Sequence, residues 1–268
     1  MKVLAFYLFG AANIAMGVLN LVWGDFDPAH QPVQALSDRI PGQSGYAYLT
    51  GALLVAGGAA MVSRSRWAAW GALVLAVVNL AVAVFWLPRL YTAPHYLGVT
   101  VPVVTGVLGG AFRQAIIVCA ALLAYATLAS DRLTRSEALT GVARWVFGLG
   151  SIDFGLVHLT SVAVNAPYVP VWMPFGRDFW VFLTGAAFIL AGIAIIVRLF
   201  DVTAARLLGL MLLVFSAFTL LPNLTANVHD LGSWGGNVHE FVLVGSAWIF
   251  SEWLAEHANA RVGQRVPV

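Results

Sequence analysis

Long apolar runs alternate with short polar segments along the whole chain. Each run is close to the ~20 residues that a helix needs to cross ~30 Å of hydrocarbon. A backbone in lipid must satisfy its own hydrogen bonds, so every run predicts a transmembrane helix. The eight predicted spans cover residues 3–23, 45–62, 67–87, 112–130, 145–163, 179–197, 204–221 and 237–254.

The pattern of the first half of the chain returns in the second half. Matching phrases are "FGAANIAMGVLNL" and "FGLGSIDFGLVHL" (offset 138), "LTGA" twice (offset 134), "LPRLYTAPHYL" and "LPNLTANVHDL" (offset 134), and "GGAFRQ" and "GGNVHE" (offset 126). Four matches in the same order predict a tandem duplication of a four-helix unit. Because the number of helices in the unit is even, both copies are expected to insert with the same orientation, as parallel repeats.

The sequence therefore predicts an all-α membrane protein whose eight transmembrane helices form two parallel four-helix-bundle repeats. The predicted parts are a first repeat at 1–130, a cytoplasmic linker at 131–144, a second repeat at 145–256 and a cytoplasmic tail at 257–268. The stretch 98–111 has no full-length equivalent in the second half, and we expect either a re-entrant piece or an extended outer loop.

Two segments rich in proline and aromatic residues follow the first helix of each half, at 24–43 and 165–180. Proline limits helix formation there, so we expect these segments to fold over the outer interface as caps.

Composition and charge agree with a polytopic membrane protein. The chain is 60% hydrophobic and 10% charged, with a mean hydropathy of +0.86, far from the ~25% charged residues of soluble domains. A net charge of +2 gives no reason to expect nucleic acid binding. With the N-terminus inside, ten Lys and Arg residues lie on the inner side and four on the outer side, which predicts that both termini are cytoplasmic. The single cysteine, Cys119, excludes an internal disulfide.

The chain resembles the DoxX-like family of bacterial membrane proteins. The resemblance lies in Arg144…Gly148…Gly155-Leu-Val-His158, in "VWMP…FWVFLTGAAFILAG", and in "VWGDF…HQPV" followed by "YLTGALLVAGG". It covers both halves and implies two fused DoxX-type bundles in the bacterial cytoplasmic membrane. Founding members of that family are linked to quinone-coupled respiratory complexes, including thiosulfate:quinone oxidoreductase. The resemblance therefore implies a quinone as ligand and a respiratory or redox partner subunit.

One face of the first helix in each half combines small and polar residues at i, i+3, i+7 and i+10. The residues are Gly148, Ser151, Gly155 and His158 in the second half, and Gly10, Asn13, Gly17 and Asn20 in the first. Small residues allow close helix contact in lipid, and polar ones bond across it. The face is interpreted either as a packing seam or, at His158, as the wall of an outward-facing polar pocket.

Asp153 is an acid predicted near the middle of the membrane. An unpaired charge there costs at least ~2.5–3.5 kcal/mol, so such residues are candidates for function. Its counterpart in the first half is Ala15, and a protonated side chain that bonds between helices is the alternative. Asp153 and His158 are five residues apart, about 140° around a helix, so they need not share a site.

Further polar residues gather at the outer ends of the last helices. His239 and Glu240 match Arg113 and Gln114, and His229 and His95 lie just upstream. In the second half, His158, His229, His239 and Glu240 are expected at similar depth, where they suit interfacial hydrogen bonding, a quinone or small-ligand site, or a metal or haem. Their spacing matches no named metal motif. The first half offers His95, Arg113, Gln114 and Asn20, a set suited to a polar or anionic head group.

The leading hypothesis is an inner-membrane protein that binds a lipophilic or small ligand, such as a quinone, in an outward-facing pocket, as a redox-linked subunit. His158 and His239 would donate hydrogen bonds to two carbonyls, and Glu240 would orient His239 or relay its proton. The alternatives are a small-molecule transporter or carrier that uses Asp153, and a non-catalytic accessory or scaffold subunit. The sequence does not decide whether the protein is an enzyme.

Overall fold

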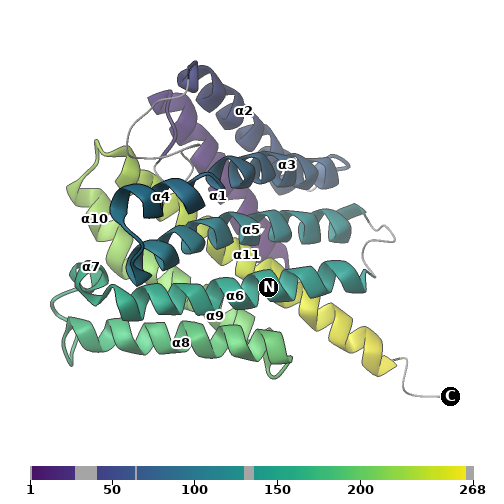
Figure 1. The fold of residues 1–268 in the computed structure, drawn as a ribbon. Coiled ribbons are helices and arrows are strands. Elements are labelled where there is room, and N and C mark those ends of the chain that lie inside the picture. Colours follow the sequence, from purple (N-terminus) through teal and green to yellow (C-terminus); the bar gives the residue numbers. More distant parts are fainter. Residues whose placement is uncertain (1, 28–40, 64, 130–135, 264–268) are drawn as a thin grey trace.

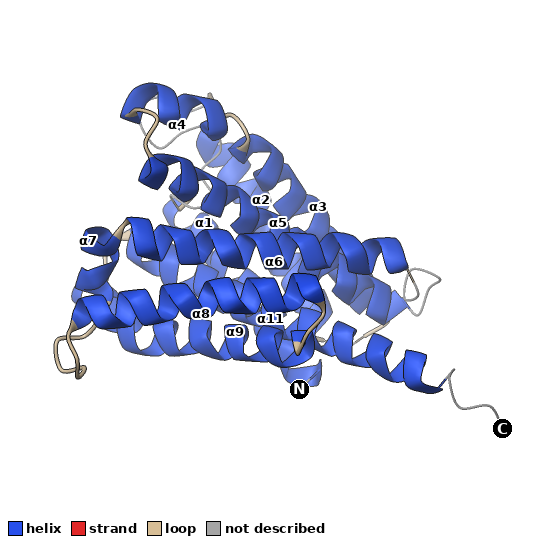
Figure 2. Ribbon diagram, turned by 60° about the horizontal axis from the view of Figure 1, so that its bottom comes forward, coloured by secondary structure: helices blue, strands red, loops and turns tan. Residues whose placement is uncertain are grey.

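The structure, a computed structural model, describes residues 2–27, 41–63, 65–129 and 136–263. All regular elements in these ranges are helical, and they contain no strand (Figure 2). The longer helices are α1 (Lys2–Trp23), α2 (Gln43–Val62), α3 (Ala68–Trp86), α4 (Arg89–Leu97), α5 (Val101–Ala129), α6 (Glu137–Thr160), α8 (Arg177–Val197), α9 (Asp201–Phe215) and α11 (Leu231–Gly263). Shorter ones are α7 (Val162–Asn165), the 3-10 turn η2 (Ala166–Tyr168), the π-helical turn η3 (Ser216–Leu220) and α10 (Leu221–Ala226).

Seven helices in the described ranges are long and apolar enough to cross a membrane. The prediction of an all-α membrane protein is confirmed, but the eighth predicted span, 237–254, lies in α11, which is not among the seven. Polar residues such as Asn237, His239 and Glu240 lower its mean hydropathy. They are accommodated because α11 packs between α1, α5 and α9, so that protein covers much of its surface.

Several predicted boundaries change in the structure. The stretch 98–111 is neither a re-entrant piece nor a loop, because α5 begins at Val101 and continues for 29 residues. Pro102 fits there, since the first turn of a helix has no hydrogen-bond partner for its N–H groups. The predicted linker is helical from Glu137 onward, and the predicted tail is helical up to Gly263. Most of the first predicted cap, 28–40, and part of the linker lie outside the described residues.

Figure 1 shows α2 and α3 on one side of the molecule and α8 and α9 on the other, with α5 and α11 between them. The first helix of each half packs against the last helix of the other half: α1 contacts α11, and α6 contacts α5. The approach of α1 to α11 is close, because a Cβ atom built on Gly245 would lie 2.7 Å from the backbone of Phe9. Helices of one half therefore pack against helices of the other half. The prediction of two four-helix bundles did not include these contacts.

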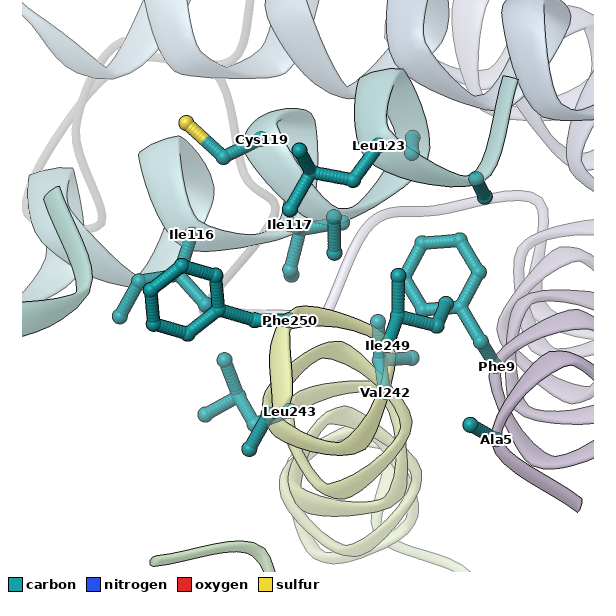
Figure 3. Packing of buried hydrophobic residues seen from close by; sticks show 14 of the residues in the cluster. Ala5, Phe9, Ile116, Ile117, Cys119, Leu123, Val242, Leu243, Ile249 and Phe250 are labelled. Carbon is teal, nitrogen blue, oxygen red and sulfur yellow. The ribbon is translucent and has the colours of Figure 1, made fainter. Parts of the chain in front are cut away.

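The apolar core lies where these central helices meet. Side chains of α1, α5 and α11 converge there, among them Phe9, Ile117 and Ile249 (Figure 3). On the other side of α11, the ring of Phe250 stacks on that of Phe147 from α6, with 4.3 Å between ring centroids. Burial of these side chains joins the two halves through a single core.

Glycine pairs bring the first two helices of each half into backbone contact. A Cβ atom built on Gly17 would lie 2.5 Å from the carbonyl oxygen of Gly51, and one built on Gly155 would lie 2.5 Å from that of Gly185. Gly10 meets Gly58, and Gly148 meets Gly192, one step along the same seams. The small-residue face singled out in the sequence is thus a packing seam in both halves, with α6 and α8 side by side along it (Figure 2).

Ion pairs join helix ends at one end of the molecule. Arg144 of α6 contacts Asp201 of α9 at 2.6 Å and donates to the carbonyl oxygen of Ile195 at 3.0 Å. Glu252 of α11 pairs with Arg206 of α9 at 2.9 Å. Lys2 pairs with Glu256 at 2.6 Å. The end of α11 is thereby linked to both α1 and α9.

Candidate functional site

A cleft of about 1250 Å³ opens between α8 and α9. Its walls are mainly apolar and include Leu190, Ala191, Leu207 and Met211. The side chains of Leu190 and Leu207 are more than half exposed, so the cleft is open along the sides of two helices that are apolar enough to cross a membrane.

The helix pairs α2–α3 and α8–α9 differ at two aligned positions. In the first half, α2 and α3 meet through Gly57 and Gly71, and a Cβ atom built on Gly71 would lie 2.5 Å from the carbonyl oxygen of Gly57. At the offset of 134 residues, Ala191 and Ala205 take their places. Alanine adds a methyl group at each position, and the contact between α8 and α9 is smaller than that between α2 and α3.

The end of the cleft near the C-terminus of α6 is polar, and His158 lines it. Its Nδ1 lies 2.8 Å from the carbonyl oxygen of Phe154, and its ring packs near Phe188 and Phe215, at centroid distances of 5.2 and 6.1 Å. A carbonyl oxygen can only accept a hydrogen bond, so Nδ1 carries the proton. In the neutral ring, Nε2 is then a hydrogen-bond acceptor.

Phe215 is positioned by the end of α9. The helix runs directly into the π-helical turn η3, a local widening that recurs at functional sites. Phe218 of this turn lines the cleft with Phe215 and packs against Trp172, at a centroid distance of 6.1 Å. The aromatic side chains thus close around the polar end of the cleft from the α9 side.

Two further polar residues line this end of the cleft: Arg113 from α5 and Glu240 from α11. Their closest charged atoms are 4.0 Å apart, too far for a hydrogen bond. The Nε atom of Arg113 and the Oε2 atom of Glu240 are enclosed by protein and make no hydrogen bond to the described residues. Arg113 belongs to the first half of the chain, so residues of both halves build the cleft.

The other candidates in the second half lie elsewhere. His239 is fully buried and does not line the cleft, and His229 is exposed in the loop before α11. The three histidines His158, His229 and His239 are thus not brought together. Among the residues that the structure describes, no group of three or more His, Cys, Asp or Glu side chains is placed to hold a metal ion.

In the first half, Asn20 takes the position that His158 has in the second. The Cβ atoms of Asn20 and His158 lie 3.1 Å from a Cβ atom built on Gly51 and Gly185, respectively. Unlike His158, Asn20 is fully buried, as is Gln114. His95 is exposed on α4, where its ring lies 6.0 Å from that of Tyr91 and 5.2 Å from that of Tyr96.

Asp153 faces α5 rather than the cleft. Its Oδ2 atom would lie 3.0 Å from a Cβ atom built on Gly109, and it makes no hydrogen bond to the described residues. The side chain is buried, with 6% of the residue exposed. Asp153 and His158 therefore occupy different faces of α6.

The sequence analysis did not single out a buried pair of opposite charges in the first half, Asp27 and Arg89. Asp27 is 1% exposed and lies against Gly235 of α11. Arg89, whose charge is attracted by Asp27, is 7% exposed and lies 3.8 Å from the centroid of the Trp86 ring. The available signal was the spacing of Trp86 and Arg89, which puts both on one side of a helical turn.

Asp230 lines the cleft just before the first residue of α11 and caps that helix. Its carboxylate accepts hydrogen bonds from the Ser233 hydroxyl and the Ser233 backbone N–H, both at 2.7 Å. These hydrogen bonds lower the pKa of Asp230 below its usual value. The primary role of this residue is therefore to satisfy the N-terminus of α11.

Replacing Asp230 with alanine is expected to lower the free energy of unfolding by about 0.5–1 kcal/mol, because the N-cap is lost at an exposed position. Asp230→Asn keeps an acceptor and serves as the control. Because the folded-state pKa is lowered, the stabilisation by charge is complete above the unfolded pKa of ~3.9 and is lost as pH falls through the folded value. Thermal unfolding in detergent at neutral and acid pH measures this loss of stability. Equal pH dependence of Asp230→Asn and the unchanged protein would contradict this role.

Comparisons of the chain with models of known families, with curated proteins and with solved structures found no match. Membership of the DoxX-like family therefore remains a prediction, which is based on the sequence motifs alone. Function is argued from the cleft itself.

Proposed function

We propose that the protein is a DoxX-like protein of the bacterial cytoplasmic membrane that binds an amphiphilic ligand, such as a quinone, in the cleft between α8 and α9. The observation that carries the proposal is the polarity gradient along the cleft. Apolar side chains such as Leu207 and Met211 line its length, and His158, Arg113 and Glu240 gather at one end. Ligand sites typically combine apolar walls with a few convergent polar groups.

The open side of the cleft supports access from the bilayer. Leu190, Leu207 and Val214 line the cleft and are also exposed on the surface of α8 and α9. An alkyl tail that lies along these side chains exchanges one apolar environment for another, at little cost in free energy. The head group is then held where the polar residues are.

The polar residues change the roles expected for a quinone head. His158, whose Nδ1 proton is bonded to the Phe154 carbonyl oxygen, does not donate to a quinone carbonyl. Arg113 takes the donor role for a carbonyl that the sequence analysis gave to His239, because Arg113 lines the cleft and an arginine only donates. A bound quinone exchanges electrons and protons. The chain's own residues orient the head: Arg113 donates to a carbonyl, and Glu240 can accept a hydrogen bond from the reduced, hydroxyl-bearing form.

The membrane topology and the tandem duplication belong to the same proposal. The glycine pairs Gly17–Gly51 and Gly155–Gly185 have the same geometry at offsets of 138 and 134 residues, which supports two parallel copies of one unit. With α11 as the eighth span, both termini lie in the cytoplasm, as the distribution of Lys and Arg favours. A redox partner subunit would exchange electrons with the bound quinone.

The direct test is binding of decylbenzoquinone and decylhydroquinone to the full chain in lipid nanodiscs, measured by calorimetry. We expect saturable binding of one molecule per chain, and amphiphile in near-stoichiometric amount in the organic extract of protein purified in mild detergent. Decylbenzene, which has the tail without the polar head, is expected to partition without saturation. If neither probe saturates and no amphiphile is extracted, the proposal is wrong.

A further inference from the structure

The fold fixes which nitrogen of His158 faces a ligand. The Nδ1 atom donates to the carbonyl oxygen of Phe154, one turn earlier in α6, at 2.8 Å. Nε2 makes no hydrogen bond to the described residues and is not among the polar atoms that protein encloses. The neutral ring therefore presents an accessible acceptor at the polar end of the cleft.

A second acceptor lies at the same end. Glu240 lines the cleft; its Oε2 atom is enclosed by protein, and its Oε1 atom is the acceptor that a ligand can reach. Arg113 supplies the donor, 4.0 Å from Glu240. The polar end thus combines two acceptors and one cationic donor, which suits a head group that itself donates hydrogen bonds.

We infer that the cleft selects amphiphiles whose aromatic head carries a hydroxyl group, with His158 Nε2 as the acceptor that determines this specificity. The inference rests on the proposed function and narrows it: the reduced, hydroxyl-bearing head binds more tightly than the carbonyl or ether form of the same molecule. A carbonyl or ether oxygen opposite Nε2 leaves two acceptors facing each other, with no hydrogen bond formed.

An aromatic head fits the surroundings of this acceptor. The rings of Phe188 and Phe215 flank His158, at centroid distances of 5.2 and 6.1 Å, and both residues line the cleft. Offset or edge contacts between aromatic rings add to the stabilisation that comes from buried area alone. A hydroxyl group on such a ring can donate to Nε2 while the ring itself contacts the two phenylalanines.

The first half lacks this site. Asn20, at the position of His158, is fully buried, and both polar atoms of its side chain are enclosed by protein. The seam between α2 and α3 is closed by Gly57 and Gly71. The selectivity is therefore expected at one site per chain, in the second half.

The test compares three probes with the same tail under anaerobic conditions: decylhydroquinone, its dimethyl ether and decylbenzoquinone. Calorimetry on the full chain in nanodiscs is expected to give roughly three- to tenfold tighter binding of decylhydroquinone, the effect of one hydrogen bond. In His158→Phe, which keeps a ring between the two phenylalanines, this preference is expected to fall to within about twofold.

Histidine nitrogen NMR on the unchanged protein provides a second readout that does not depend on a variant's folding. One of the six histidines is expected to show an unprotonated Nε2 resonance that shifts on addition of decylhydroquinone and not of its dimethyl ether. Binding of all three probes within about twofold of one another would overturn the inference and leave the proposed function standing. A preference for decylbenzoquinone that disappears in His158→Phe would also overturn it, since His158 would then be a donor. Binding of none of them would remove the proposed function as well.

Discussion

Replacing Gly155 with alanine is expected to lower the free energy of unfolding by about 1–3 kcal/mol, the usual cost of overpacking a close contact. The added methyl group would lie 2.5 Å from the carbonyl oxygen of Gly185 and 2.6 Å from the side chain of Ile189. The side chain can rotate away, but the carbonyl belongs to the backbone of α8. The seam between α6 and α8 must therefore open along part of its length. Thermal unfolding in detergent measures the loss.

Gly141→Ala is the matched control, because it makes the same change in the same helix. Apart from the adjacent residues and the backbone of the same helix, no described atom lies within 4 Å of a Cβ atom built on Gly141, so alanine gains about 0.5–1 kcal/mol there from its higher helix propensity. Opposite effects of the two substitutions would establish close packing as the cause. Equal effects at Gly155 and Gly141 would show that the glycine seam does not hold α6 to α8.

The glycine seams are the part of the fold that the sequence predicts best. Gly10 and Gly17, like Gly148 and Gly155, are seven residues or about two turns apart, so that each pair lies on one helix face where a close helix contact is possible. The interlocking of the halves was not predictable in the same way. In lipid, the apolar side chains that face protein and those that face the bilayer are of the same kinds, so the contact of α1 with α11 leaves no distinct pattern.

The sequence analysis did not predict which side of its helix each candidate residue faces. His239 and Glu240 are neighbours in the sequence and share one level of α11, yet adjacent residues point about 100° apart on a helix. As a result, Glu240 lines the cleft and His239 is buried away from it. The cleft itself was not predicted. Its apolar lining residues, such as Leu207 and Met211, are of the same kinds as residues that face lipid, so the sequence does not distinguish them.

The cleft proposal predicts that a single aromatic side chain in its wall removes binding. Ala187 of α8 lines the cleft beside Phe188 and is half-buried. The ring in Ala187→Phe would occupy the space in which the ligand head and the first part of its tail lie. The affinity for decylhydroquinone is expected to fall by roughly tenfold or more, because contacts worth more than ~1.4 kcal/mol are lost. Calorimetry in nanodiscs measures the change.

The neighbouring Ala186 provides the control for this substitution. It is exposed on α8 and does not line the cleft, so in Ala186→Phe the same ring enters the bilayer, which accepts an apolar side chain on a transmembrane helix. Both variants add identical volume to adjacent positions and keep the glycine seam of α8 intact. Thermal unfolding of the two proteins should therefore be similar, while binding is lost only in Ala187→Phe. Unchanged affinity in Ala187→Phe would place the ligand outside the cleft, because a filled space cannot also hold the head group.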